Sequence, residues 1–89
     1  MRCSIISPEG RDDFQNITSI YLVTTSGERE LLEGHIALIA ILQEGPSLRL
    51  CLENQMVRIT ISPGSFFQFT HDNAEVVTAH YSIEWCALQ

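Results

Sequence analysis

Lysine is absent from this sequence, and its five arginines are outnumbered by eleven aspartates and glutamates, for a net charge of -6. A protein that binds nucleic acid needs clustered basic residues to displace counterions from phosphates, so this balance argues against such a partner. Without lysine there is also no Gly-x-x-x-x-Gly-Lys loop to hold nucleotide phosphates. We therefore expect no nucleic-acid partner and no cofactor. An acidic domain suits a basic protein surface, and their attraction weakens as salt rises.

Cysteine is also sparse, and the three cysteines, Cys3, Cys51 and Cys86, are widely spaced without a Cys-x-x-Cys pair. This spacing argues against both a disulfide framework and a zinc site. The three histidines of the sequence have no spacing that favours a metal. A cysteine–histidine nucleophile pair stays open, because such partners meet only in the folded chain. A small cysteine-dependent enzyme would need a thiol of depressed pKa. We regard this as the weakest of our functional hypotheses.

Long hydrophobic runs are missing as well. The apolar run at residues 36–42 is far shorter than the roughly 20 residues that cross a bilayer, so we expect no direct membrane insertion. No basic segment followed by an apolar one opens the sequence, so we expect no signal peptide and an intracellular, soluble chain. The run contains three isoleucines between Gly34 and Gly45, which favours a strand covered on both faces. We interpret residues 26–33 before it as an acidic loop.

The rest of the chain shows strand periodicity interrupted by turn signals. We predict strands at residues 2–7 and 17–25, a polar bend at 12–15, large apolar area from the three phenylalanines at 66–69, and sustained alternation over 75–85. This pattern predicts an all-β fold: an antiparallel β-sandwich or flattened barrel of about 8–10 short strands, as a single domain over residues 1–89. The expected core residues are Ile20, Leu22, Leu38, Leu48, Leu50, Val57, Ile59 and Ile61.

Residues 47–61 predict a hairpin whose register is specified by alternation on both arms. Leu50 lies opposite Val57 in this register, and a slip of one residue would turn either apolar set outward. The same register places Arg49 opposite Arg58, a like-charge pair that is destabilising unless an anion lies nearby. We expect either an anionic neighbour or two arginines that simply extend into water.

Four short segments carry a resemblance to a known family. Residues 27–38 read Gly-Glu-Arg-Glu-Leu-Leu-Glu-Gly-His-Ile-Ala-Leu. This resembles the Gly-x-x-x-(Ile/Val)-Leu-Pro-Gly-His-x-Pro-Leu signature of the epsilon subunit of F-type ATP synthases, called delta in mitochondria. Residues 42–45 stand where that family has Leu-Lys-Pro-Gly, residues 61–66 resemble its Val-Ser-Gly-Gly-Phe, and residues 5–10 match at the start. Order and spacing agree along about residues 3–80.

The resemblance implies a β-sandwich that is not an enzyme but a rotor subunit of the central stalk. Such a subunit joins gamma to the c-ring in a hetero-oligomeric complex during proton-driven ATP synthesis, at the cytoplasmic face of a bacterial inner membrane. The implied c-ring contacts are Glu28, Arg29, Glu30, Glu33 and His35. For gamma, the expected contacts are Arg49, Arg58, Tyr81 and Trp85. The chain departs from the signature at three of these positions, since Glu33 replaces a proline, and Arg29 and Glu30 replace an apolar residue and a glycine.

We also have expectations for His35, for residues 77–85 and for an alternative function. His35 could be a ligand or proton donor, but a hydrogen bond to backbone at the base of the loop is the favoured interpretation. The family usually continues into two C-terminal helices that inhibit ATP hydrolysis, whereas strand alternation occupies residues 77–85 here. We expect that segment to join the sandwich edge, with neither inhibition nor ATP binding by these residues. The leading functional alternative is a stand-alone β-sandwich module that binds a peptide or small ligand.

Overall fold

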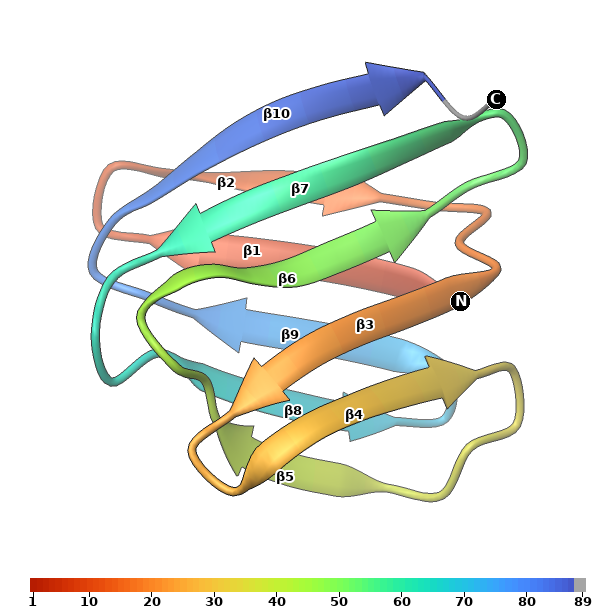
Figure 1. The fold of residues 1–89 in the computed structure, drawn as a ribbon, viewed down its shortest axis with the longest axis horizontal. Coiled ribbons are helices and arrows are strands. Elements are labelled where there is room, and N and C mark those ends of the chain that lie inside the picture. The colour runs from red at the N-terminus through yellow and green to blue at the C-terminus, as the bar shows by residue number, and fades with distance from the viewer. Residues whose placement is uncertain (88–89) are drawn as a thin grey trace.

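Ten strands pack as two five-stranded sheets in the computed structural model, which describes residues 1–87. Sheet A has the strand order β2-β1-β9-β8-β5, and sheet B, which lies in front of it in Figure 1, has the order β10-β7-β6-β3-β4. The strands are β1 Arg2–Ser7, β2 Gly10–Phe14, β3 Ser19–Thr24, β4 Gly27–Leu32, β5 Leu38–Ile41, β6 Gly45–Cys51, β7 Gln55–Ile61, β8 Phe66–Thr70, β9 Asn73–Val77 and β10 Tyr81–Ala87. The predicted all-β sandwich is confirmed. Residues 88–89 of the predicted single domain lie outside the described part.

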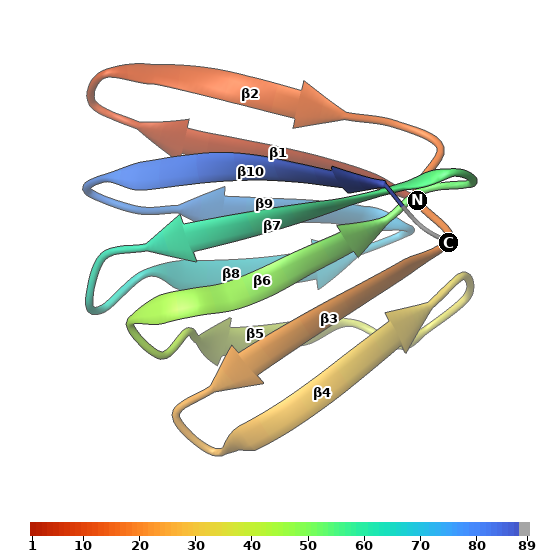
Figure 2. The same cartoon turned by 45° about the horizontal axis from the view of Figure 1, so that its top comes forward.

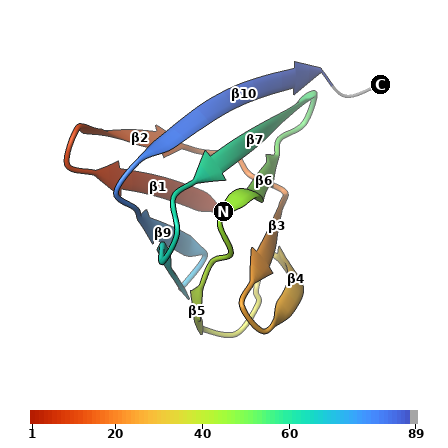
Figure 3. The same ribbon diagram turned by 60° about the vertical axis from the view of Figure 1, so that its left-hand side comes forward.

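The connections are hairpins within a sheet and crossings between sheets, and two crossings in succession lead into and out of β5. Hairpins join β1 to β2, β3 to β4, β6 to β7 and β8 to β9. All strand pairs are antiparallel except β1 with β9, which run parallel and depart from the predicted purely antiparallel arrangement. Figure 3 shows how the edge strands of the two sheets are arranged. Strand β10 lies over β2 at one side of the sandwich, and β4 lies beside β5 at the other.

The hairpin predicted at residues 47–61 forms in the expected register. Leu50 pairs with Val57 and Arg49 with Arg58 across β6 and β7. The predicted core is buried with one exception, Leu38, which is half-buried and packs against the core from the edge strand β5. Inward-facing residues of both sheets therefore interdigitate between them, as expected for an aligned sandwich.

The apolar run at residues 36–42 is not covered on both faces, so that prediction was wrong. Its strand, β5, is the edge of sheet A, and only alternate side chains point inward. Ile36 is 79% exposed and Ile39 is 66% exposed, whereas Leu42 is fully buried. A continuous apolar run cannot by itself distinguish a core strand from a strand whose outer face awaits a partner.

Two charged segments interpreted as irregular are in fact edge strands. The acidic loop at residues 26–33 is mostly β4, which pairs with β3 and buries Leu31, while Glu28 and Glu30 face away from the core. The polar bend at 12–15 is the end of β2, which pairs with β1 and buries Phe14. Edge strands often carry charge because it discourages pairing with other molecules, and this charge masked the strand pattern.

The alternation at residues 75–85 belongs to two strands in different sheets, not to one. Strand β9 lies inside sheet A with Val76 buried and Val77 exposed, and β10 forms the edge of sheet B. The chain crosses between the sheets at residues 78–80, which reverses which side chains face the core. The expectation that the tail joins the sandwich edge is confirmed, since β10 pairs with β7 and the Trp85 ring lies 5.8 Å from that of Phe14.

Buried hydroxyl groups join two of the crossings at one end of the sandwich, on the left in Figure 2. The Ser65 hydroxyl lies 2.6 Å from the Ser62 carbonyl oxygen and 2.7 Å from Thr78 Oγ1, and can donate to either. Thr78 Oγ1 donates to the His80 carbonyl oxygen at 3.0 Å. Because satisfied buried polar groups specify one arrangement, this hydroxyl cluster of Ser62, Ser65 and Thr78 ties the turn before β8 to the turn before β10.

Candidate partner-binding surfaces

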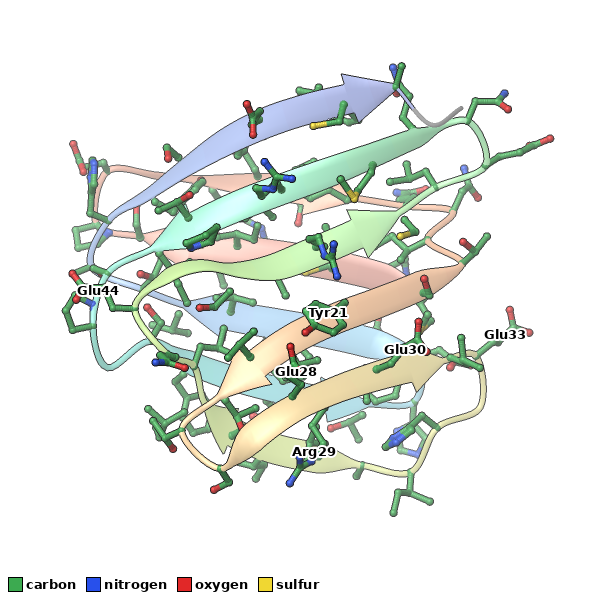
Figure 4. All side chains as sticks on the ribbon, viewed as in Figure 1. Tyr21, Glu28, Arg29, Glu30, Glu33 and Glu44 are labelled. Carbon is green, nitrogen blue, oxygen red and sulfur yellow. The ribbon has the colours of Figure 1, made fainter. Side chains whose placement is uncertain are left out.

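The five expected c-ring contacts lie along β4 and the connection that follows it. Glu28 and Glu30 project from the outer face of sheet B, while Arg29 lies on the opposite side of β4 and lines a hollow beside β5. Glu33 and His35 lie in the connection between β4 and β5. In Figure 4 the three acidic residues follow one another along the lower edge of the sheet. The structure therefore gathers the acids at one edge and separates the arginine from them.

Tyr21 holds Glu28 from the neighbouring strand. The Tyr21 hydroxyl donates a hydrogen bond to Glu28 Oε1, and Figure 4 shows the two side chains together on the outer face of sheet B. The guanidinium carbon of Arg49 lies 4.2 Å from the centroid of the same ring, within cation–π range. Sequence reasoning missed Tyr21; only the register of β3 with β4 and β6 could have indicated it.

The connection after β4 is held at both sides of Gly34. The Gly34 N–H donates to Asp72 Oδ1 at 2.9 Å, and the His35 N–H donates to the Leu32 carbonyl oxygen at 3.0 Å. His35 Nδ1 lies 2.7 Å from the carbonyl oxygen of Ile36, and the ring meets Phe69 edge-on. The favoured interpretation of His35, a backbone hydrogen bond at the base of the loop, is confirmed.

Outward-facing residues of sheet B form a row across all five strands, here called the charged row: Glu84, Arg58, Arg49, Tyr21 and Glu30. Arg58 Nη1 donates to Glu84 Oε1 at 3.0 Å, so the anionic neighbour expected for the arginine pair is present. Arg49 has an aromatic ring beside it instead. Much of the polar surface of this face is thus already engaged within the chain.

The four expected gamma contacts do not lie together. The two arginines are on the outer face of sheet B, whereas Tyr81 and Trp85 face inward from β10 toward β2. The Tyr81 hydroxyl donates to Asp12 Oδ2 at 2.6 Å. This hydrogen bond, with desolvation and the nearby negative charges, raises the pKa of Tyr81 to about 12. Tyr81 and Trp85 therefore close the edge between β10 and β2, where Trp85 packs against Phe14 and stays half exposed.

Sheet A carries a row of a different kind on its outer face, here called the apolar row: Ile6, Val77, Phe66 and Ile41. Val77 is 50% exposed and Ile41 is 42% exposed, and Ile39 extends the surface along β5. Contiguous exposed apolar residues mark interaction surfaces in soluble proteins. Sequence reasoning missed this surface because its residues come from four strands that are distant in the sequence.

Metal-ligand clusters and the Cys3 thiol bear on the enzyme hypothesis. Among residues 1–87 there is no group of three or more His, Cys, Asp and Glu side chains that could hold a metal. Burial raises the pKa of the Cys3 thiol to about 12, so this thiol stays protonated and inert at neutral pH. Within the same range of the chain, no helix has the length and apolar character to cross a membrane.

A polar hollow of about 570 Å³ lies beside β2 on sheet A, with Ser4, Arg11 and Asp13 in its lining. Asp13 accepts hydrogen bonds from the Ser4 hydroxyl at 2.5 Å and from Arg11 Nε at 3.1 Å. These hydrogen bonds, from Ser4 first and then Arg11, lower the pKa of Asp13. Arg11 and Asp13 of this hollow therefore already bind each other, which leaves these two groups less available to a small ligand.

Comparison with known proteins decides the family. Residues 1–82 match the family described as ATP synthase, Delta/Epsilon chain, beta-sandwich domain. The chain belongs to this family. The resemblance drawn from residues 27–38 is thereby confirmed, together with the β-sandwich that it implied. No curated protein sequence matches the chain.

A solved structure contains a longer chain whose fold is similar to that of this protein. The central stalk and c-ring structure of the Tetrahymena thermophila mitochondrial ATP synthase contains a chain of similar fold, with a TM-score of 0.71 and 13% identical residues. The superposition covers 91% of this chain but 64% of that one, so this chain spans less than two-thirds of its length. At this identity the similarity shows the fold alone.

Proposed function

We propose that this delta/epsilon-type sandwich is a non-catalytic subunit of the central stalk, which joins gamma to the c-ring of an ATP synthase. The observation that carries the proposal is the family match over residues 1–82. The similar chain of known structure comes from a central stalk and c-ring assembly. A coupling subunit needs a rigid body with two binding surfaces, and the sandwich offers an acidic edge and an apolar face. We place the subunit at the cytoplasmic face of a bacterial inner membrane, in a proton-driven enzyme.

The acidic edge is the proposed contact with the ring. Glu28, Glu30 and Glu33 are exposed and adjacent along β4 and its connection, and none of them forms an ion pair within residues 1–87. Exposed charges of one sign attract a basic surface and orient it, with an effect that falls as salt rises. Arg29 and His35 complete the proposed contact from the β5 side and from the base of the loop.

The outer face of sheet A is the proposed main contact with gamma. Burial of exposed apolar surface stabilises an interface by roughly 25 cal/mol per Å² before the cost of association, and the apolar row is well placed to be buried. Arg49 and Arg58 remain proposed polar contacts from the other face, and Tyr81 and Trp85 from the edge between β10 and β2. The apolar row supports gamma binding better than these four residues do, because the polar groups of Arg49, Arg58 and Tyr81 already have partners within the chain.

Purification from the native membrane tests the function directly. The tagged chain, expressed in its own cells, is extracted with mild detergent, and the native mass of the purified assembly is measured. We expect gamma and the ring subunits to co-purify with it. Recovery of the chain alone, or bound only to a peptide or small molecule, would contradict the proposal and favour the stand-alone binding module.

A further inference from the structure

The connection between β4 and β5, residues 33–37, is exposed and is held in place by a few hydrogen bonds. Ile36, at 79% exposed, is the most exposed of the large apolar side chains described, and Glu33 stands exposed beside it. Gly34 has a φ of +86°, in the left-handed region that favours glycine. A segment this exposed and this tightly bent has little burial to hold its shape, so its hydrogen bonds decide how it is presented.

The carboxylate of Asp72 reaches this connection from a different hairpin. His71 and Asp72 form the two-residue turn between β8 and β9, with φ values of +51° and +60°. Two positive φ values in a two-residue hairpin loop are those of a type I′ turn, where glycine and asparagine are favoured. The backbone carbonyl oxygen of Asp72 accepts from the Arg2 N–H at 3.0 Å, which fixes the turn to β1. From this anchored position Asp72 Oδ1 accepts from the Gly34 N–H at 2.9 Å.

We propose that Asp72 is a positioning residue for the ring contact: it touches no partner, but through Gly34 it sets the conformation in which Glu33 and Ile36 meet the ring. The inference rests on the proposed function. A carboxylate that accepts from a backbone N–H makes a charge-assisted hydrogen bond, stronger than a neutral one. Without it, the connection must be ordered at the moment of binding, and that ordering weakens the complex.

Three variants distinguish a positioning role of Asp72 from an effect on folding and from an effect of its charge. In Asp72→Gly the acceptor is lost while the turn gains the residue that its φ favours, so stability should hold or rise. In Asp72→Asn the charge is lost, but an acceptor oxygen and tolerance of the turn remain. His71→Gly is the matched control, because it alters the same turn at a side chain that donates and accepts no hydrogen bond within residues 1–87.

The variants are titrated, each in complex with purified gamma, against the detergent-solubilised c-ring of the same enzyme. We expect Asp72→Gly to bind the ring about 3- to 10-fold more weakly, the range that one hydrogen bond of ordinary strength commands. Asp72→Asn should recover most of the affinity, and His71→Gly should bind like the wild type. In the isolated chain, hydrogen exchange at the Gly34 amide should speed up in Asp72→Gly alone.

Each contrary result has a distinct meaning. Wild-type affinity in Asp72→Gly overturns the positioning role while the proposed function stands. An Asp72→Asn variant as weak as Asp72→Gly shows that charge, not the hydrogen bond, is what matters, and also overturns the inference. If the wild-type complex itself does not bind the ring, the proposed function fails, and the Gly34 exchange result still reports whether Asp72 orders the connection.

Discussion

The outer face of each sheet carries a row of side chains on paired strands, but the two rows differ in chemistry. On sheet B the charged row contains carboxylate, guanidinium and phenol groups, and several of them contact one another. On sheet A the corresponding apolar row leaves Val77 and Ile41 about half exposed, with nothing covering them among the described residues. A face whose groups are already paired gains little from a partner, whereas an uncovered apolar face gains by being buried. This difference is why we propose sheet A as the main contact with gamma.

The strongest test of this difference between the two faces is to introduce charge into the apolar row. Ile41→Glu together with Val77→Glu should weaken gamma binding by at least about 100-fold, because two unpaired carboxylates would be buried in the interface. Both side chains point outward, so the fold should survive with a modest loss of stability. Calorimetric titration with purified gamma measures the effect. On the other face, Arg49→Gln with Arg58→Gln should weaken gamma binding much less, because these two proposed contacts already have partners within the chain. The reverse ranking would favour sheet B as the main gamma contact.

A smaller effect is expected where sheet B ends in its acidic edge. Replacing Glu28, Glu30 and Glu33 by Gln should weaken ring binding by about 10-fold at low salt, and the difference should shrink as salt rises. Gamma binding should change little, since Glu28 and Glu30 project from the outer face of sheet B, whereas the apolar row is on the outer face of sheet A. The thermal midpoint should stay near that of the wild type because exposed substitutions usually cost less than about 0.5 kcal/mol. Equal ring binding by the triple variant at low salt would remove the edge from the contact.

The hydroxyl cluster links two of the turns that join the sheets. Its contribution can be measured from the free energy of unfolding alone. Ser65→Ala should lower the free energy of unfolding by about 1–2 kcal/mol, since it removes a buried hydrogen-bonding group. The exposed Ser82→Ala is the control and should be near neutral. Neither variant should alter gamma or ring binding below the unfolding transition. A stability loss in Ser82→Ala equal to that in Ser65→Ala would show that the cluster contributes nothing.

The smallest effect concerns the Tyr81–Asp12 hydrogen bond that closes the edge between the faces. The pKa of Tyr81 is raised from 10.0 to about 12 in the fold, so its contribution is complete below pH 10. That contribution is lost as pH rises from about 10 to about 12, because the unfolded state releases its proton first. Tyr81→Phe should therefore differ from the wild type at pH 8 and converge with it near pH 12. Denaturant unfolding at several pH values measures this; a constant difference would contradict the assignment.

Local pattern predicted much of this fold because β structure with one buried face leaves a period of two in the sequence. The register of β6 with β7 followed from alternation alone, since any slip would expose one apolar set. The same rule failed at β4 and β2, where charged edge strands leave only Leu31 and Phe14 buried. It failed again at β5, because an apolar side chain that awaits a partner cannot be told in the sequence from one that lies in the core.

By itself, then, the sequence determined the all-β class, the central hairpin, most of the core and the family. These depend on side-chain periodicity and on short motifs, which are local properties. Only the tertiary structure decided which outward residues are neighbours. The apolar row draws from β1, β5, β8 and β9, and the hydrogen bond from Gly34 to Asp72 joins the β4–β5 crossing to the β8–β9 hairpin. Such pairings depend on strand order and on the parallel pairing of β1 with β9, and no local pattern specifies these because they arise from how the two sheets cover one core.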